Sequence, residues 1–117
     1  MTNAATLEEA RRELVAGWDI VIPTVDDHTT YNVLLHALEE RIFDLLQHNP
    51  RKLTSTLYIL DISERRYLQA LDQPTMQDRA HDLARAVLER ETEKIAMRQR
   101  YAANQRENLP DPSRSRP

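Results

Sequence analysis

The chain contains a single glycine, Gly17, among its 117 residues. Tight turns between strands and the loops that hold nucleotide phosphates depend on glycine, because only glycine adopts positive φ freely and lets the backbone approach a phosphate closely. A chain that is nearly without glycine is therefore poorly suited to tight hairpins or to a nucleotide-binding loop. This absence predicts a helical protein.

The apolar composition supports the same prediction. Hydrophobic residues make up 40% of the chain and aromatic residues 5%, with one Trp and one Phe. The core must therefore consist mainly of Leu, Ile, Val and Ala, which suits packing between helices better than a β-sandwich. A chain of this length fits one domain. We expect an all-α protein, a small helical bundle of four to five helices with one long C-terminal helix.

Apolar residues that recur every three or four positions place the helices. The predicted helices span residues 6–16, 30–48, 50–61, 64–72 and 75–103. The second, third and fifth of these should form the body, and the first should fold against it. Residues 1–103 then form a single helical domain. Residues 104–117 contain one large apolar side chain and are predicted to be a disordered tail.

Side chains that can accept a hydrogen bond from the first turn mark the helix starts. Thr6 is predicted to cap the first helix, and Gly17 to follow its last turn as a C′ residue. Thr75 is expected to cap the last helix. For the helix at residues 64–72, either Ser63 is the cap or Asp61 takes that role; the sequence leaves both open.

Residues 18–29 do not have a helical pattern. Alternating apolar residues followed by a proline predict an extended linker segment packed on the helices. Its apolar side chains either cover one end of the bundle or dock on a partner protein or a second copy. The candidate interaction residues of this segment are Trp18, Ile20, Ile22 and Val25.

The C-terminal half of the last helix is a second candidate surface. From residue 89 to residue 100 it is mostly charged, so it is expected to project beyond the bundle or to pair with another helix. The candidate interaction residues here are Ile95, Met97, Arg98 and Tyr101. The alternative is a solvated helix that carries ion pairs along its surface.

No set of residues points to catalysis or to a bound cofactor. The chain has no cysteine, so thiol chemistry and a thiolate zinc site are excluded. His36, Glu40, Asp44 and His48 form one row along the helix at 30–48, and Asp78 precedes His81 by three residues; solvated surface and helix-cap roles are the favoured interpretations. We expect no enzyme, no metal, no cofactor and no small-molecule substrate.

Charge is distributed unevenly along the chain. The net charge is −3, with 8 Lys and Arg against 14 Asp and Glu in residues 1–84, but 8 against 5 in residues 85–117. A helix-turn-helix at 50–72 could offer Arg65, Arg66 and Gln69 to a nucleic-acid groove, with the basic C-terminal end as a supplement (Arg106, Arg114, Arg116). The acidic balance of the domain argues against this, because phosphate neutralisation supplies most of the affinity for nucleic acid.

The N-terminal residues are polar, and no apolar run approaches the ~20 residues of a membrane-spanning helix. We therefore expect a cytoplasmic protein that does not enter a membrane.

Two segments, LYILDISE at residues 57–64 and AHDLARAVLERE at residues 80–91 followed by Lys94, together resemble a group of small, uncharacterised bacterial helical proteins. That group carries a leucine–tyrosine–arginine–aliphatic–aspartate–aliphatic–serine–glutamate motif, and the resemblance covers roughly residues 33–100. Ile59 stands where the group has arginine. The resemblance assigns no function.

The sequence thus favours a non-catalytic module that binds another protein or a second copy of itself. The alternative is a nucleic-acid-associated regulator that uses the basic C-terminal end.

Overall fold

The computed structural model describes residues 3–22 and 29–108. This part of the chain contains five α-helices and no strand: α1 (Ala4–Trp18), α2 (Tyr31–His48), α3 (Pro50–Ile59), α4 (Glu64–Leu71) and α5 (Met76–Asn108). The predicted all-α bundle with a long C-terminal helix is confirmed.

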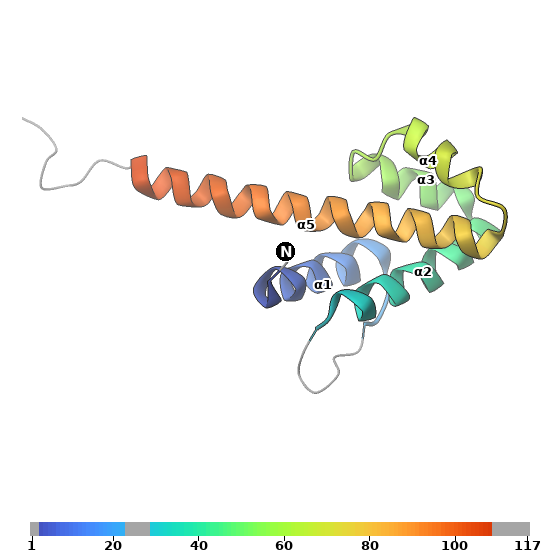
Figure 1. The fold of residues 1–117 in the computed structure, drawn as a ribbon, viewed down its shortest axis with the longest axis horizontal. Coiled ribbons are helices and arrows are strands. Elements are labelled where there is room, and N and C mark those ends of the chain that lie inside the picture. Colours follow the sequence, from blue (N-terminus) through green and yellow to red (C-terminus); the bar gives the residue numbers. More distant parts are fainter. Residues whose placement is uncertain (1–2, 23–28, 109–117) are drawn as a thin grey trace, which may run out of the picture.

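Helix α5 organises the molecule. Its 33 residues span about 50 Å at a rise of about 1.5 Å per residue. Helices α1, α2 and α4 pack against α5, and α3 packs against α2. In Figure 1, α1 and α2 lie along one side of α5, α3 and α4 lie near its N-terminal half on the other, and its C-terminal end projects beyond them. Helix α5 is therefore the packing partner of three of the other helices, and α2 connects it to α3.

The core is built from the leucine-rich stripes that the sequence predicts. Residues spaced three or four apart on one helix face the same side, so α2 buries Leu34, Leu38, Ile42 and Leu45 together. The largest fully buried side chains come from α1, α2, α3 and α5: Leu14, Leu34, Leu38, Ile42, Leu53, Leu83, Val87, Leu88 and Ile95.

Short polar side chains begin the helices, as expected, but not always the ones predicted. The Asn3 side chain accepts a hydrogen bond from the Thr6 amide at 2.8 Å, so Asn3 caps α1 and the prediction of Thr6 is wrong. Ser63 accepts from the Arg66 amide at 3.1 Å and Thr75 from the Asp78 amide at 3.0 Å. Of the two caps left open for α4, the structure therefore has Ser63.

Helices α1 and α3 end in a left-handed residue that is not glycine. Asp19 has φ 53° and Asp61 has φ 61°, a conformation that Asp tolerates better than most residues. Gly17 lies inside α1, so its predicted place after the helix is wrong. After α3, the Ile62 amide donates to the Leu57 carbonyl and the Asp61 amide to the Tyr58 carbonyl, each at 3.0 Å. This is a Schellman motif with Asp61 at C′.

Several predicted boundaries also change. Trp18 is the last residue of α1, so the segment outside the helices begins at Asp19; residues 23–28, with Val25, lie outside the described residues. Helices α3 and α4 end two residues and one residue earlier than predicted. Helix α5 continues to Asn108, so the tail prediction is wrong for residues 104–108; its remaining part, with Arg114 and Arg116, is also outside the described residues.

Half-buried arginines connect the helices. Arg41 donates from Nε to the Trp18 carbonyl at the end of α1, and Arg90 from Nε to the Leu60 carbonyl after α3, each at 3.0 Å. Cationic groups are favourable at helix C-termini, where carbonyls lack intrahelical partners. These contacts join the ends of α1 and α3 to α2 and α5. None of the five described helices is long and apolar enough to cross a membrane.

Candidate interaction surface

The predicted interaction residues divide into buried and exposed sets. Trp18 is 2% exposed, and Ile22 and Ile95 are also buried in the core. Ile20 is half-buried and packs against the same core. For the part of residues 18–29 that the structure describes, packing on the bundle is therefore the interpretation that holds, and these four side chains are not a free docking surface.

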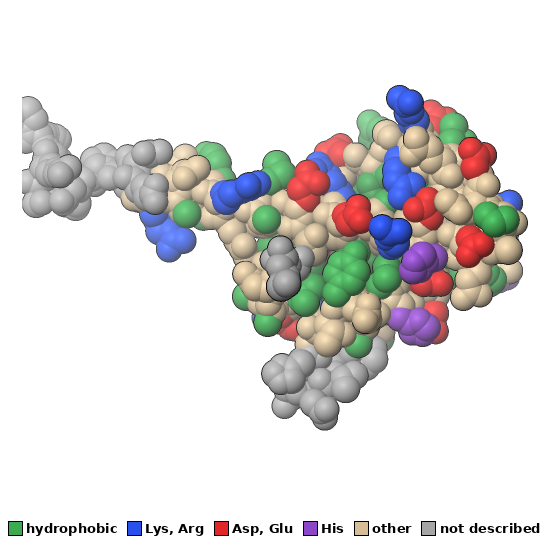
Figure 2. Space-filling view, viewed as in Figure 1, with side chains coloured by type: hydrophobic (Ala, Val, Ile, Leu, Met, Phe, Trp, Pro, Cys, Tyr) green, Lys and Arg blue, Asp and Glu red, His purple; other side chains and the backbone are tan. Residues whose placement is uncertain are grey.

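The other predicted residues lie on the projecting end of α5. Met97 and Tyr101 are exposed at 47% and 67%, and because they are four residues apart they share one face of the helix. Arg98 instead turns toward α1, where its Nη2 lies 3.2 Å from Glu13 and 3.7 Å from Glu9. On the face drawn in Figure 2, this end shows hydrophobic and basic side chains without acidic ones.

A second apolar surface lies between α3 and α4, and the sequence analysis missed it. A hollow of about 370 Å³ opens there. Two large side chains on it are strongly exposed, Tyr58 at 82% and Leu68 at 51%. We call this hollow the α3–α4 groove; it is lined by Thr54, Leu57, Tyr58, Ile62, Ser63, Glu64, Tyr67 and Leu68.

Local structure explains the shape of the groove. The Schellman motif after α3 brings Ile62 back toward Leu57, the contact that commonly accompanies this motif. Ser63 then starts α4 in a new direction. The floor of the groove is thus fixed by the chain reversal, and Tyr58 and Leu68 stand on its two sides.

A sequence signal for the groove existed. On α3 the core stripe is Leu53 and Leu57, and Tyr58 is next to this stripe but not on it. A large apolar residue outside the stripe of a short helix must be exposed or covered by another element. The sequence does not say which, because the direction of α4 depends on the turn at residues 60–63.

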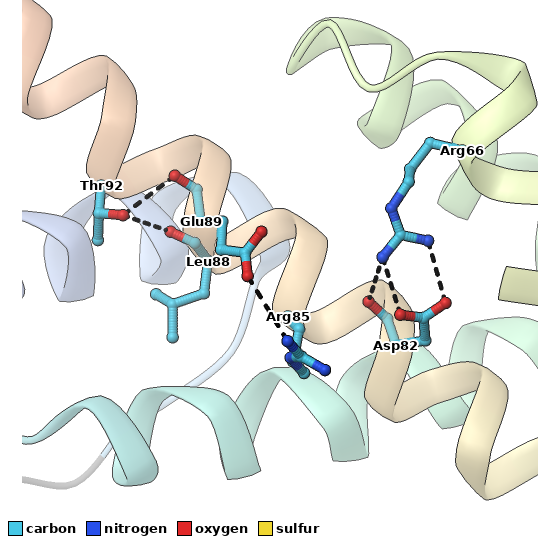
Figure 3. A network of polar contacts seen from close by, with 6 residues as sticks. All are labelled: Arg66, Asp82, Arg85, Leu88, Glu89 and Thr92. Atoms are coloured by element: carbon cyan, nitrogen blue, oxygen red, sulfur yellow. Dashed lines mark hydrogen bonds and ion pairs between the residues drawn. The ribbon is translucent and has the colours of Figure 1, made fainter. Parts of the chain in front are cut away.

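The polar contacts around α4 bear on the nucleic-acid alternative. Arg66 forms a two-pronged contact with Asp82 of α5, Nη1 to Oδ2 at 3.0 Å and Nη2 to Oδ1 at 2.8 Å (Figure 3). This hydrogen bonding lowers the pKa of Asp82 and raises that of Arg66. One of the three side chains expected to enter a nucleic-acid groove is therefore engaged within the protein.

Three histidines that the sequence analysis considered each contact a single carboxylate. His36 lies 3.2 Å from Glu40 and His48 3.0 Å from Asp44, all on exposed side chains of α2. His81 meets Glu39 across α5 and α2 at 3.0 Å. Within residues 3–22 and 29–108, no three His, Asp or Glu side chains gather where they could hold a metal ion.

Comparison with known proteins finds no match to this chain. No protein-family model matches the chain, and no curated protein or solved structure does either. The resemblance to the bacterial helical group stays a prediction.

Proposed function

We propose that the protein is a non-catalytic helical module that binds another protein or a second copy of itself. The observation that carries this proposal is the α3–α4 groove, an apolar hollow with Tyr58 and Leu68 exposed on its sides. Apolar concavities flanked by aromatic side chains are typical of surfaces that another protein covers. Tyrosine is common at such sites because it offers a large apolar ring and a hydroxyl.

The projecting end of α5 supports the same proposal. Met97 and Tyr101 form an exposed apolar pair on a helix that extends beyond its own bundle. An amphipathic helix without a partner in its own chain can be completed by a groove or helix of another. We propose that this activity takes place in the cytoplasm.

The test compares association of the wild type with that of groove variants. We would measure mass by sedimentation velocity across a range of protein concentrations, and by native mass spectrometry of untagged protein from its own cells. We expect a dimer or a defined heteromer. Tyr58→Ser combined with Leu68→Ser should return it to a monomer with an unchanged melting temperature, since both side chains are already exposed.

Two matched variants sharpen this test. Val21→Ser removes another strongly exposed apolar side chain, which lies outside the groove, and should leave association unchanged. Tyr101→Ser removes an exposed aromatic side chain from the end of α5 and should weaken association. A bare monomer in both measurements would contradict the proposal.

One observation favours the alternative, a nucleic-acid-associated regulator. Residues 97–106 carry Arg98, Arg100 and Arg106 and no acidic residue. If this end binds nucleic acid, affinity for random duplex should fall steeply as salt rises, and Arg100→Gln with Arg106→Gln should weaken it. Binding that is absent at low ionic strength would remove this alternative.

A further inference from the structure

A separate recess lies where α1, α3 and α5 meet. Its volume is about 310 Å³, and its wall includes Trp18 and Gly17 of α1, Ile59 and Leu60 at the end of α3, and Glu91 of α5. This volume is at the lower end of the range for small-molecule sites. The recess shares no lining residue with the α3–α4 groove, so a ligand could occupy it whether or not the groove is covered.

Glu91 is the unusual member of this wall. It is 6% exposed, and its carboxylate makes no hydrogen bond or ion pair with any residue in the described part of the chain. Every fully buried side-chain oxygen in the described residues has a hydrogen-bond partner. The carboxylate oxygens of Glu91 therefore keep a narrow contact with solvent, and Glu91 is one of the residues that line the recess.

An unpaired carboxylate in such a place is costly. Burial raises the pKa of Glu91 above its ordinary value, because a charge removed from water loses hydration that nothing replaces. A folded chain that needed only packing at this position would gain from an apolar residue. The position therefore suits a group that supplies the missing positive charge.

The other charged residues on the wall do not supply it. Glu13 of α1 is engaged by Arg98 at 3.2 Å. Lys94 lines the recess and lowers the pKa of Glu91 through space, but its ammonium is not within ion-pair distance of that carboxylate. Glu13 is thus already paired, and Glu91 is the wall carboxylate that has no cation at ion-pair distance among the described residues.

Apart from Thr56, the remaining wall is apolar, and it has an opening. Leu60 and the largely buried Trp18 provide hydrocarbon surface, and Ile59 is exposed beside them at 74%. Gly17 leaves space: a β-carbon there would meet nothing within 4 Å. A molecule with a positive end and a short apolar stem would match both the carboxylate and this surface, and an aromatic ring nearby favours cations.

We propose that this recess binds an organic cation, a protonated amine with an apolar stem, through the carboxylate of Glu91. The amine is either a free small molecule or the lysine side chain of a partner protein, and the two share the same alkylammonium chemistry. A free amine in this recess would depart from the expectation from sequence that the chain takes no small-molecule substrate.

Trp18 makes the site directly observable, because it is the only tryptophan in the chain. We would titrate the protein at pH 8 with n-butylammonium and follow the indole N–H of Trp18 and the amides of Gly17 and Glu91 by nuclear magnetic resonance. We expect saturable shifts with a Kd of about 1 mM, suitable for so small a ligand. n-Butanol, of similar shape but uncharged, should bind at least ~10-fold more weakly, since a charge-assisted contact is lost.

Three variants test the assignment. Glu91→Gln keeps the shape and removes the charge, and should weaken n-butylammonium at least ~10-fold. Glu89→Gln, an exposed carboxylate on the same helix outside the recess, should leave the Kd unchanged. Lys94→Gln removes a competing positive charge and should strengthen binding a few-fold. Their melting temperatures establish that each variant folds.

The outcomes decide the proposal and its ligand. Equal affinity of wild type and Glu91→Gln, equal affinity for n-butanol, or no saturable shift in either wild type or Lys94→Gln would each overturn it. Where binding is found, Nα-acetyl-lysine amide separates the two sources. Affinity at least equal to that of n-butylammonium assigns a lysine side chain, and weaker affinity assigns a free amine.

Discussion

Asp19 and Asp61 both adopt the left-handed conformation that usually belongs to glycine at the end of a helix. A short polar side chain that can hydrogen-bond locally makes this conformation less costly for Asp than for most residues. Because the chain has a single glycine, it is these two Asp residues that allow α1 and α3 to end sharply. The reversal at Asp61 also sets the direction of α4 and, with it, the α3–α4 groove.

Glu91 gives a prediction about pH. Burial raises the pKa of its carboxyl; Glu13 on α1 adds to this effect, and the cations Lys94, Arg98 and Arg90 on α5 oppose it. A carboxyl whose pKa is raised on folding binds its proton more tightly in the folded state. Its favourable contribution is present at low pH and is lost as pH rises through the raised pKa. Glu91→Gln removes this dependence.

We therefore expect the melting temperature of Glu91→Gln to exceed that of the wild type at pH 8 by about 2–4 °C. The difference should shrink as the pH is lowered to 4. Thermal unfolding followed by circular dichroism across this range measures it, with Glu89→Gln as the control that should show no such trend. If this difference in melting temperature does not change with pH, folding does not raise the pKa of Glu91.

At the scale of helices, Gly17 allows a direct test of where α1 ends. Gly17 is exposed inside the helix, its φ is not positive, and a β-carbon there would meet nothing within 4 Å. Gly17→Ala should therefore stabilise the protein by about 0.5–1 kcal/mol, because alanine has less freedom to lose and favours the helix. Denaturant unfolding measures this change.

A replacement at Asp19 tests the same helix boundary from the other side. Asp19→Gly should also stabilise, since glycine has no steric cost at φ 53°. If Gly17→Ala instead lowers the stability, Gly17 is the residue in the left-handed conformation and α1 ends earlier than the structure has it.

Much of the helix pattern follows from the sequence, but its limits have physical causes. The leucine stripe of residues 34–45 and the cap Thr75 depend on local chemistry, so periodicity and residue type predict them. For α4, residue type alone left Asp61 and Ser63 both open as the cap. The start of α1 was misplaced because Asn3 and Thr6 are both good caps, and only the fold decides between them. The end of α5 was misplaced because composition alone suggested disorder after residue 103.

The candidate surface is less predictable, because exposure is a property of packing between helices. The same apolar pattern fits Trp18 in the core and Trp18 at an interface, and only its burial in the folded bundle distinguishes them. Met97 and Tyr101 were found because they are apolar residues within or directly after a mostly charged stretch of the helix. Tyr58 and Leu68 were missed because the angle between α3 and α4 was not predictable.

At the scale of the molecule, the two halves of α5 lie in different environments. Its first half, from Ala80 to Ile95, buries side chains against three other helices, while residues 99–106 are exposed throughout. An exposed helical end is held only by its own hydrogen bonds and by continuity with the packed part. The protein should therefore fold as one core with an extension whose stability is local.

Hydrogen exchange along α5 tests this division. Backbone amides from Ala84 to Ile95 should exchange only through global unfolding, and amides after Gln99 should exchange with little protection, because fraying there breaks no core contact. Ala102→Pro should abolish the helix around residue 102 and shift the melting temperature of the core by less than about 2 °C. Ala84→Pro, at a fully buried position of the same helix, should prevent folding. If Ala102→Pro lowers the melting temperature by much more, the extension is packed in solution, most simply against a second copy, and sedimentation velocity of that variant should then show the loss of a dimer.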